Sequence, residues 1–478
     1  ADAHPGVRFG ARVGGGGNVK VTADDPTGLA HLAGIDLGPS GSRLGPLVFN
    51  ASVDGDQDRL VVDVGMMADG AELWVRGTLG ALAENLTMDV AYGVAHPNFP
   101  DLAQALAWRG LATGAQVLDG PVSLRGTAAG TLLNLQVGVT GALAGADVGV
   151  VGTMAWSDRV AYSLQASITH DHAAVVLAGF GMGPGDDPDF GPLQVRGALD
   201  GDGQQLAISG LQAAIGPSEF TGTANLGFGS DLFRMGATVA ATELDLAAFF
   251  PGIAGPAATD DGDIRRNWSV EPIDFSIVEA ANLDLNLTAE TLDGFGLAFT
   301  DASLSVRTAN GVLAVDDFHG NGLGGAVAVA LTVTNGAVPS LEGTLDLAAA
   351  DLSMLPGFGW DLGVTSGTVN AHFDLKTVGA SERELVANLE GSMSLEGSDG
   401  MLEGFSLANF NGRFAEIKDV AELNALMQPA MRSGQTPFVT LRAEAAMRQG
   451  VIEFDELAAD LPFETVETTG EIDLPRRR

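Results

Sequence analysis

Apolar and polar residues alternate with a period of two along most of this chain. In the segment 47–54 every second residue is apolar, at Leu47, Phe49, Ala51 and Val53. Successive side chains of a β-strand point to opposite faces of a sheet, so this alternation predicts strands with one mainly apolar and one mainly polar face. The same pattern recurs in segments that begin near residues 122, 133, 233, 283, 327 and 368.

Three landmarks recur in register and indicate an internal repeat. A Gly-Pro-apolar tripeptide begins at residues 45, 120 and 191, at intervals of 75 and 71 residues, and a Gly-Thr pair follows 31 or 32 residues later. An Asp then opens a small, apolar segment, and we interpret it as the N-cap of a short helix. These residues are Asp101, Asp171 and Asp245, with a fourth example at Asp351. Each repeat is thus predicted to hold about four strands and one short helix.

The landmarks divide the chain into modules of about 70 residues. We predict a partial module at 1–44, β repeats at 45–119, 120–190 and 191–250, a loop at 251–267 that is rich in Pro, Gly, Asp and Thr, a β repeat at 268–360 and a C-terminal β region at 361–478. One long helix is predicted at about 415–432, where Ile417, Val420, Leu423, Leu426 and Met427 have helical spacing.

Composition narrows the class of protein. The net charge of −37 excludes a typical nucleic-acid binder, whose affinity depends on basic side chains. With 46% hydrophobic residues the chain can bury a large apolar surface, and without Cys it has neither disulfides nor thiolate metal sites. No apolar run approaches the roughly 18 residues that span a bilayer.

The apolar face has to be covered, and the alternation leaves three ways open. The sheet can fold onto another sheet, close into barrels, or curl into an open groove that is filled by something apolar. Large apolar faces that stay open usually mark a binding site.

Few residues suggest metal or catalytic chemistry. His170 and His172 flank Asp171 as a zinc half-site would, although a polar turn before a short helix is the favoured interpretation. The acidic pairs at 24–25, 186–187, 260–261 and 316–317 lack EF-hand spacing and are interpreted as solvated loops. The glycines at 14–17 are not followed by Gly-Lys-Ser/Thr, and no Gly-x-Ser-x-Gly occurs. We therefore expect no enzyme, no cofactor, no metal site and no catalytic residue.

Short motifs in the C-terminal half resemble the AsmA family of Gram-negative envelope proteins, a group related to TamB-like and bridge-like lipid transport proteins. Their order and spacing between about 268 and 474 carry the resemblance, rather than any one of them. They are WSVEPID at 268–274, LDL at 283–285, NGVL at 310–313, GG at 324–325, LEGS at 389–392, DGMLEG at 399–404, the predicted helix within 419–434, QGVI at 449–452 and GEIDL at 470–474.

The resemblance implies a mostly β, elongated, antiparallel repeating β-groove, taco-like in section, whose modules are separated by short helices. It implies that phospholipid acyl chains travel along the groove through the periplasm between inner and outer membranes, in support of outer-membrane homeostasis. Family members begin with an inner-membrane anchor, so this chain is expected to be a fragment of an anchored periplasmic protein, with outer-membrane proteins as possible partners. Residues expected to line the groove are Phe49, Leu135, Val150, Phe220, Met235, Leu285, Val329, Leu345, Phe373 and Leu441.

Two other functions fit the same pattern. In the first, the repeats form a scaffold or assembly factor for outer-membrane protein biogenesis, which pairs its edge strands with a partner. In the second, the chain is a secreted β-solenoid adhesin with a packed core and rungs of about 20 residues. The helix at 415–432 is predicted to cap or plug the groove, because Glu416, Asp419 and Glu422 outnumber Lys418 and do not suit a membrane-surface helix.

Overall fold

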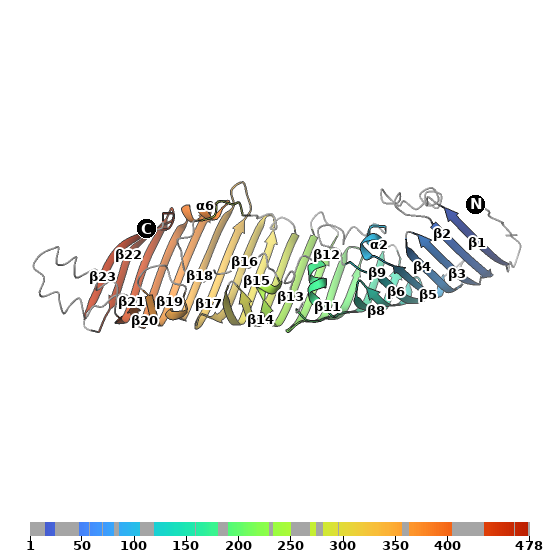
Figure 1. The fold of residues 1–478 in the computed structure, drawn as a ribbon, viewed down its shortest axis with the longest axis horizontal. Helices are drawn as coiled ribbons and strands as arrows, with labels where there is room; N and C mark the ends of the chain where they lie inside the picture. The colour runs from blue at the N-terminus through green and yellow to red at the C-terminus, as the bar shows by residue number, and fades with distance from the viewer. Residues whose placement is uncertain are drawn as a thin grey trace, which may run out of the picture. The chain divides into compact units, whose positions relative to one another are not determined.

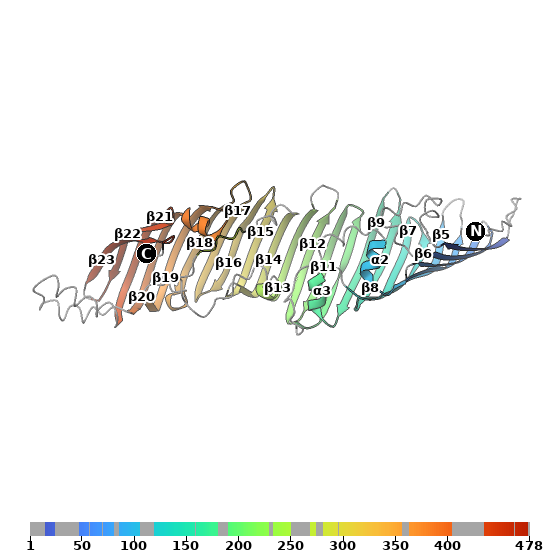
Figure 2. The same ribbon diagram turned by 45° about the horizontal axis from the view of Figure 1, so that its top comes forward.

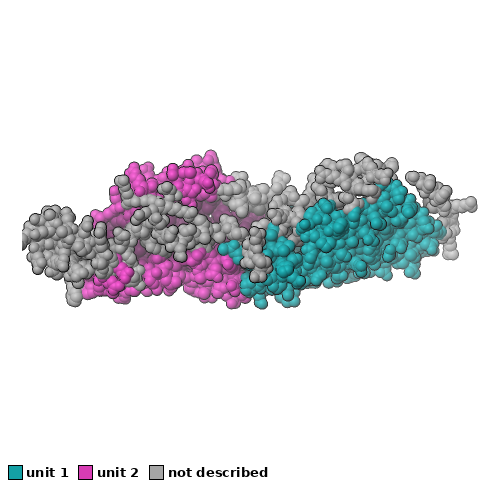
Figure 3. Space-filling view, viewed as in Figure 1, with its two compact units in different colours: residues 1–229, 247–252 teal, residues 230–246, 253–478 magenta. Residues whose placement is uncertain are grey.

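The computed structural model describes two compact units, which are coloured separately in Figure 3. Unit 1 comprises residues 1–229 and 247–252, and unit 2 comprises residues 230–246 and 253–478. The described residues are 15–23, 47–56, 58–68, 70–80, 86–105, 119–157, 159–179, 190–228, 233–249, 268–273, 281–294, 296–355, 363–403, 435–462 and 464–476.

The described part of unit 1 is a meander in which each strand pairs antiparallel with the next one along the chain (Figure 1). The strands are nine to eleven residues long. They are β1 (Gly15–Ala23), β2 (Leu47–Gly55), β3 (Arg59–Ala68), β4 (Ala71–Gly80), β5 (Thr87–His96), β6 (Val122–Thr131), β7 (Asn134–Leu143), β8 (Ala146–Trp156), β9 (Val160–His170), β10 (Leu193–Asp202), β11 (Gln205–Ile215) and β12 (Ser218–Gly227).

The register of these pairs gathers the apolar positions of all the strands on one face. Residues directly opposite each other in neighbouring strands point to the same side of the sheet. The apolar positions predicted for each strand therefore form one continuous surface across the strands. One row crosses unit 1 from β1 to β12 without a polar side chain: Gly17, Val53, Val62, Gly77, Val90, Ala128, Val137, Gly152, Leu164, Leu199, Ile208 and Ala224. We call this side of the sheet the apolar face and the other side the polar face.

Short helices lie against the strands of unit 1, as Figures 1 and 2 both show. Helix α2 (Phe99–Ala105) buries Phe99 and Leu102 against Val122 of β6 on the apolar face. Helix α3 (Ala173–Gly179) follows β9 and buries four of its residues, and Phe249, in α4 (Leu246–Phe249), meets Phe220 edge to face. These helices cover the end of the apolar face at which β5 and β9 finish.

The predicted helix caps were partly wrong. The side chain of Asn98, rather than Asp101, caps α2, because its Oδ1 accepts the Asp101 amide at 3.1 Å. Asp171 lies two residues before α3, and Asp245 ends a strand directly before α4. Asp351 does cap the 3-10 helix η2 (Leu352–Met354), accepting from the amide of Ser353 at 2.8 Å.

The described strands of unit 2 also pair in chain order. The antiparallel prediction is wrong for the first pair, since β13 and β14 run parallel. Because β14 runs in the same direction as β13, it starts at the end of the sheet at which β13 also started. After β5 and β9, by contrast, the next strand starts at the end at which the previous one finished. The strands are β13 (Phe233–Asp245), β14 (Ala281–Gly294), β15 (Leu297–Ala309), β16 (Val312–Gly322), β17 (Gly325–Thr334), β18 (Ser340–Asp351), β19 (Gly363–Val378), β20 (Glu390–Glu403), β21 (Gln435–Arg448), β22 (Val451–Asp460) and β23 (Thr465–Asp473).

A short segment closes one edge of unit 2. Residues 268–273, which we call the strap, lie beside helix α6 (Glu382–Ala387) in the connection from β19 to β20. The amide of Ile273 donates to the carbonyl of Ala380 at 2.8 Å, and the Trp268 indole N–H donates to the carbonyl of Leu474 at 3.0 Å. The strap therefore runs from α6 to the end of β23.

The mostly β, antiparallel repeat fold predicted from the alternation is confirmed, apart from the β13–β14 pair. The strands form hairpins rather than the coiled rungs of a β-solenoid, so the architecture expected for the adhesin is wrong for the described residues. The loop at 251–267 and the helix at 415–432 lie outside the described residues. The module boundaries stay predictions.

Candidate apolar binding face

The four predicted groove residues of unit 1 all lie on its apolar face. Phe49 is opposite Met66, Leu135 opposite Met154, and Val150 opposite Val139. Phe220 is opposite Ala213 and packs its ring against Phe249, with the ring centroids 5.6 Å apart. The four residues are spread over β2, β7, β8 and β12, so they sample the whole face rather than one pocket.

The six predicted groove residues of unit 2 also share one face, and three of them are neighbours. Val329, Leu345 and Phe373 lie side by side on β17, β18 and β19. Their row crosses all the described strands of unit 2 and contains no polar side chain: Val239, Leu287, Leu304, Phe318, Val329, Leu345, Phe373, Met393, Ala445, Phe454 and Gly470. Leu285 lies opposite Ala237, Met235 opposite Leu283, and Leu441 opposite Gly397.

Most of these side chains are half-buried, which distinguishes the face from a packed interior. Of the ten predicted residues Leu135 is buried, and the other nine keep part of their surface accessible to solvent. A side chain in a closed core is enclosed by other side chains on all sides. Here the strands supply neighbours in the plane of the sheet, and in unit 1 the short helices cover one end. Within the described ranges, what remains is an apolar surface that an apolar ligand can cover.

Aromatic rings lying across glycines are a feature that the alternation did not reveal. On the apolar face Tyr92 lies over Gly126, where a Cβ atom would come within 2.5 Å of the ring. The Tyr92 hydroxyl reaches the carbonyl of Gly138 at 3.5 Å, so the ring spans β6 and ends at β7. Phe299 lies over Gly322 in the same way. Each glycine thus lets a large ring lie flat on the sheet, and only the cross-strand register could have identified these pairs.

Ion pairs occupy the polar face. Arg76 pairs with Asp63 across β3 and β4, and Lys376 with Glu342 across β18 and β19. The guanidinium of Arg307 donates to both oxygens of Asp316, at 2.5 and 2.7 Å, and these hydrogen bonds lower the pKa of Asp316. Asp316 therefore already has an ion-pair partner, and the acidic pair at 316–317 lies within strand β16 rather than in the predicted loop. The other three acidic pairs lie outside the described residues.

Ser303, His319 and Asp317 have some of the distances of a catalytic triad on this polar face, but not its geometry. Ser303 Oγ lies 2.9 Å from His319 Nε2 and 3.2 Å from Nδ1, and Nδ1 lies 3.3 Å from Asp317 Oδ1. An in-line hydrogen bond to Nε2 would place Oγ about 5 Å from Nδ1. The hydroxyl therefore lies beside the ring rather than in line with a ring nitrogen, which is not the arrangement of a Ser-His-Asp triad.

The His170-Asp171-His172 segment forms a polar turn, as predicted. His170 Nδ1 accepts the amide of His172 at 2.9 Å. His96 Nδ1 accepts the amide of Asn98 at 3.0 Å in the corresponding turn before α2, so the contact is a repeated device for entering a helix. In the described ranges no three or more His, Asp or Glu residues cluster in a way that could hold a metal ion.

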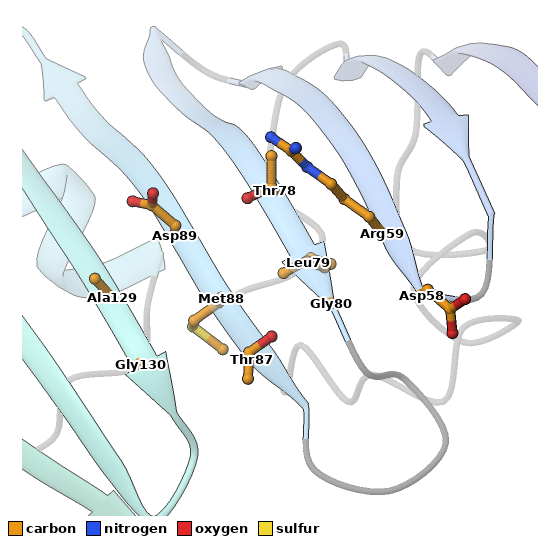
Figure 4. A pocket seen from close by; sticks show the side chains of 10 residues that line it. All are labelled: Asp58, Arg59, Thr78, Leu79, Gly80, Thr87, Met88, Asp89, Ala129 and Gly130. Carbon is orange, nitrogen blue, oxygen red and sulfur yellow. The ribbon is translucent and has the colours of Figure 1, made fainter.

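Three surface depressions lie away from the centre of the apolar rows. The depression in Figure 4, of about 430 Å³, wraps around strand ends in unit 1, since Leu79 and Met88 belong to the apolar face, whereas Thr78 and Asp89 belong to the polar face. Two others, of about 350 and 500 Å³, lie in unit 2 around His319 and His372. All three linings include charged side chains, such as Arg59 and Asp346, so the apolar faces remain the candidate site for an apolar ligand.

Residues 240–457 match the sequence model of the AsmA family. No curated protein and no solved structure matches the chain. Among the described helices none has the length and apolar character needed to span a membrane.

Proposed function

Through residues 240–457 this chain belongs to the AsmA family, and on this premise we propose that it binds phospholipid along its apolar faces. AsmA proteins are associated with the bacterial envelope. The proposed activity is the transfer of phospholipid between the inner and outer membranes, in the periplasm, in support of the outer membrane. The proposed ligands are the acyl chains. Transfer of this kind makes and breaks no covalent bond, so the proposal assigns no catalytic residue and no cofactor.

One observation carries this proposal, namely the unbroken apolar row in each unit, in which most residues are half-buried and a few, such as Val62 and Val90, are buried. A packed interior needs no such continuity, because each core residue only has to match its own neighbours. A path for an acyl chain does need it, since one polar side chain in the row would interrupt the contact. The two rows described above contain only Gly, Ala, Val, Ile, Leu, Met and Phe.

The energetics of such a path depend on matching the membrane. Each acyl methylene transferred from water to an apolar surface contributes about 0.8 kcal/mol. A lipid can therefore leave a bilayer only where the protein replaces nearly all of those contacts. The rows supply similar apolar contact from strand to strand, so a bound chain meets no deep minimum along them. Ion pairs on the polar face keep the other side of each sheet in water.

The test is mass spectrometry of organic extracts from the purified protein, with variants matched by strand. Val150→Asp and Val151→Asp place the same charge on opposite faces of β8, and Leu285→Asp and Asn286→Asp do so on β14. We expect phospholipid to co-purify with the parent and with Val151→Asp and Asn286→Asp, and to be lost from Val150→Asp and Leu285→Asp. A lipid-free parent protein would refute the proposal.

The scaffold function is the second candidate, and strand β1 favours it. The first six residues of β1 are exposed, and among the described strands β1 pairs with β2 alone. Exposed edge strands can accept a strand from a partner. In that case Val150→Asp and Leu285→Asp should leave function intact, whereas Val19→Pro should abolish it, because proline removes a ladder N–H from β1.

A further inference from the structure

The two ends of the strands in unit 1 differ in how the apolar face is finished. At one end the helices α2 and α3 bury apolar side chains against the sheet. The other end carries three hairpin turns in succession, β6–β7, β8–β9 and β10–β11, and then the end of β12. We call this second end the rim, comprising residues 131–134, 156–157, 159–160, 202–205 and 227–228.

Large apolar side chains project at the rim. Leu133 is 61% exposed, Trp156 is 56% exposed and Phe228 is 54% exposed. Trp156 comes two residues after Met154, and Phe228 two residues after Leu226, so both continue the alternation of the apolar face to its border. The apolar surface of unit 1 therefore reaches the rim without a polar boundary.

The turns of the rim are joined to one another. The Trp156 amide donates to the carbonyl of Leu132 at 2.6 Å, Arg159 Nη1 donates to Gln204 Oε1 at 3.4 Å, and the Phe228 amide donates to the carbonyl of Gln204 at 2.8 Å. With neighbouring strands about 4.8 Å apart, the rim from β7 to β12 is about 24 Å long. These contacts hold the three side chains along one connected ridge.

The chemistry of the rim fits a bilayer surface. Trp, Phe and Leu beside an Arg are the side chains that settle at the membrane interface, where amphipathic rings and a long basic side chain find both apolar and polar surroundings. The described charged residues of the rim are Arg159 and Asp202, one of each sign, in a chain of net charge −37. A surface of net-neutral lipid can therefore approach here with little repulsion, unlike an anionic one.

We infer that the rim of unit 1 docks on a bilayer of net-neutral phospholipid and that acyl chains enter the apolar face across it. The inference rests on the proposed lipid-binding function. It places the lipid headgroup outside the rim, because the helices cover the opposite border. Leu133, Trp156 and Phe228 are the residues that insert.

Flotation with phosphatidylcholine vesicles tests this inference. We compare the parent, the double variant Trp156→Ser/Phe228→Ser, the single variant Leu133→Ser, and a control Val61→Ser/Val151→Ser. The control residues are 50% and 61% exposed, but they lie on the polar face of β3 and β8. Because all the changes are at exposed positions, the variants are expected to stay folded, which circular dichroism verifies.

The expected result is a partition coefficient about tenfold lower for the double variant, a smaller decrease for Leu133→Ser, and no change for the control. Replacing about one-fifth of the phosphatidylcholine with phosphatidylglycerol should weaken binding by the parent. Unchanged flotation of both rim variants would overturn the inference, as would an equal loss in the control, which would mean that general apolar exposure drives binding.

Failure of the inference and failure of the proposed function can be told apart. If the parent co-purifies with lipid but the rim variants float like the parent, the rim assignment is wrong and the lipid-binding face stands. If the parent floats through the rim but carries no lipid, the docking surface stands and the lipid-binding function fails. If the rim binds a protein partner instead of a bilayer, the parent should not float with the vesicles. This result also overturns the inference.

Discussion

Units 1 and 2 build the same kind of face from different strands. Unit 1 uses regular strands of nine to eleven residues, and its apolar row carries glycines such as Gly77 and Gly152. Strands in unit 2 reach sixteen residues, and its row contains Phe318, Phe373 and Phe454. Helix α2 packs on the face of unit 1 against aliphatic side chains, whereas the row of unit 2 carries bulkier aromatic side chains.

The two units also differ in how they bend. Most of the non-glycine residues with positive φ lie in unit 2, including Asp301, Ala349 and Asp399. Each of these three coincides with a register shift or a skipped partner, which is the signature of a β-bulge. In unit 1 register shifts among the described strands involve only β10, β11 and β12. Most of the bulges in the described strands thus occur in unit 2.

The largest effect is expected at a glycine of the unit 1 row. Gly77 has φ +151°, and a Cβ atom there would lie 2.6 Å from the Cα of Val90. Gly77→Val should destabilise unit 1 by about 5 kcal/mol, because backbone strain and overpacking against the neighbouring strand add. Urea unfolding monitored by tryptophan fluorescence measures this, and Gly65→Ala is the control, because a Cβ atom there meets nothing within 4 Å. Equal unfolding midpoints for the two variants would contradict the prediction.

Removing a ring that lies over a glycine should affect the two units unequally. Phe299 is 8% exposed and also meets Phe318 edge to face at 5.2 Å, whereas Tyr92 is half-buried. Phe299→Ala should cost about 3–4 kcal/mol of unfolding free energy and Tyr92→Ala about 1–2.

The Phe299 and Tyr92 variants also distinguish an effect on stability from an effect on lipid binding. If the open face of unit 1 holds acyl chains, Tyr92→Ala should reduce bound lipid while the protein stays folded, and Tyr92→Phe, which keeps the ring, should not. Chemical denaturation and lipid extraction of the same preparations measure both quantities. A larger stability loss for Tyr92→Ala than for Phe299→Ala would reverse the comparison.

The strap gives a smaller effect that is confined to unit 2. Trp268→Phe keeps an aromatic ring but removes the N–H that donates to the carbonyl of Leu474. One hydrogen bond contributes about 1 kcal/mol, so amides of β23 should exchange with solvent roughly five times faster. Hydrogen exchange read by mass spectrometry measures this, with β2 of unit 1 as the internal reference. Unchanged exchange in β23 would mean that the strap does not hold that edge.

Much of the face was predictable, because the period of two assigns each strand residue to a side. All ten predicted residues lie on the apolar faces, and Val329, Leu345 and Phe373 turn out to be neighbours. The bulges were not predicted, since a spacing of three, such as that from Phe299 to Ala302, looks like a lapse in alternation. The parallel β13–β14 pair was missed for another reason. Alternation assigns faces, but it carries no information about strand direction.

The helix caps show the limit of local signals. Asp101 was chosen because an Asp precedes a small, apolar segment, but Asn98 and the polar turn at His96 had already started the helix. The rim was also missed, because Leu133, Trp156 and Phe228 occur in unrelated turns of the sequence. Only the pairing of β6 to β12 brings them to one end of the sheet. A surface that forms only when strands pair cannot be predicted from the sequence of one strand.

The smallest effect concerns two carboxyl groups whose pKa values are lowered by different means. The Arg307 guanidinium lowers the pKa of Asp316, whereas backbone amides of Gln204 and Gln205 lower the pKa of Asp202. A depressed pKa favours the folded state above the usual Asp range, and this contribution is lost as the pH falls through the folded-state value. Arg307→Gln should return the pKa of Asp316 towards about 3.9, while Arg159→Gln should leave the pKa of Asp202 low. NMR titration of the two carboxyl carbons measures both, and a large rise at Asp202 would show that the charge of Arg159, not the backbone amides, dominates there.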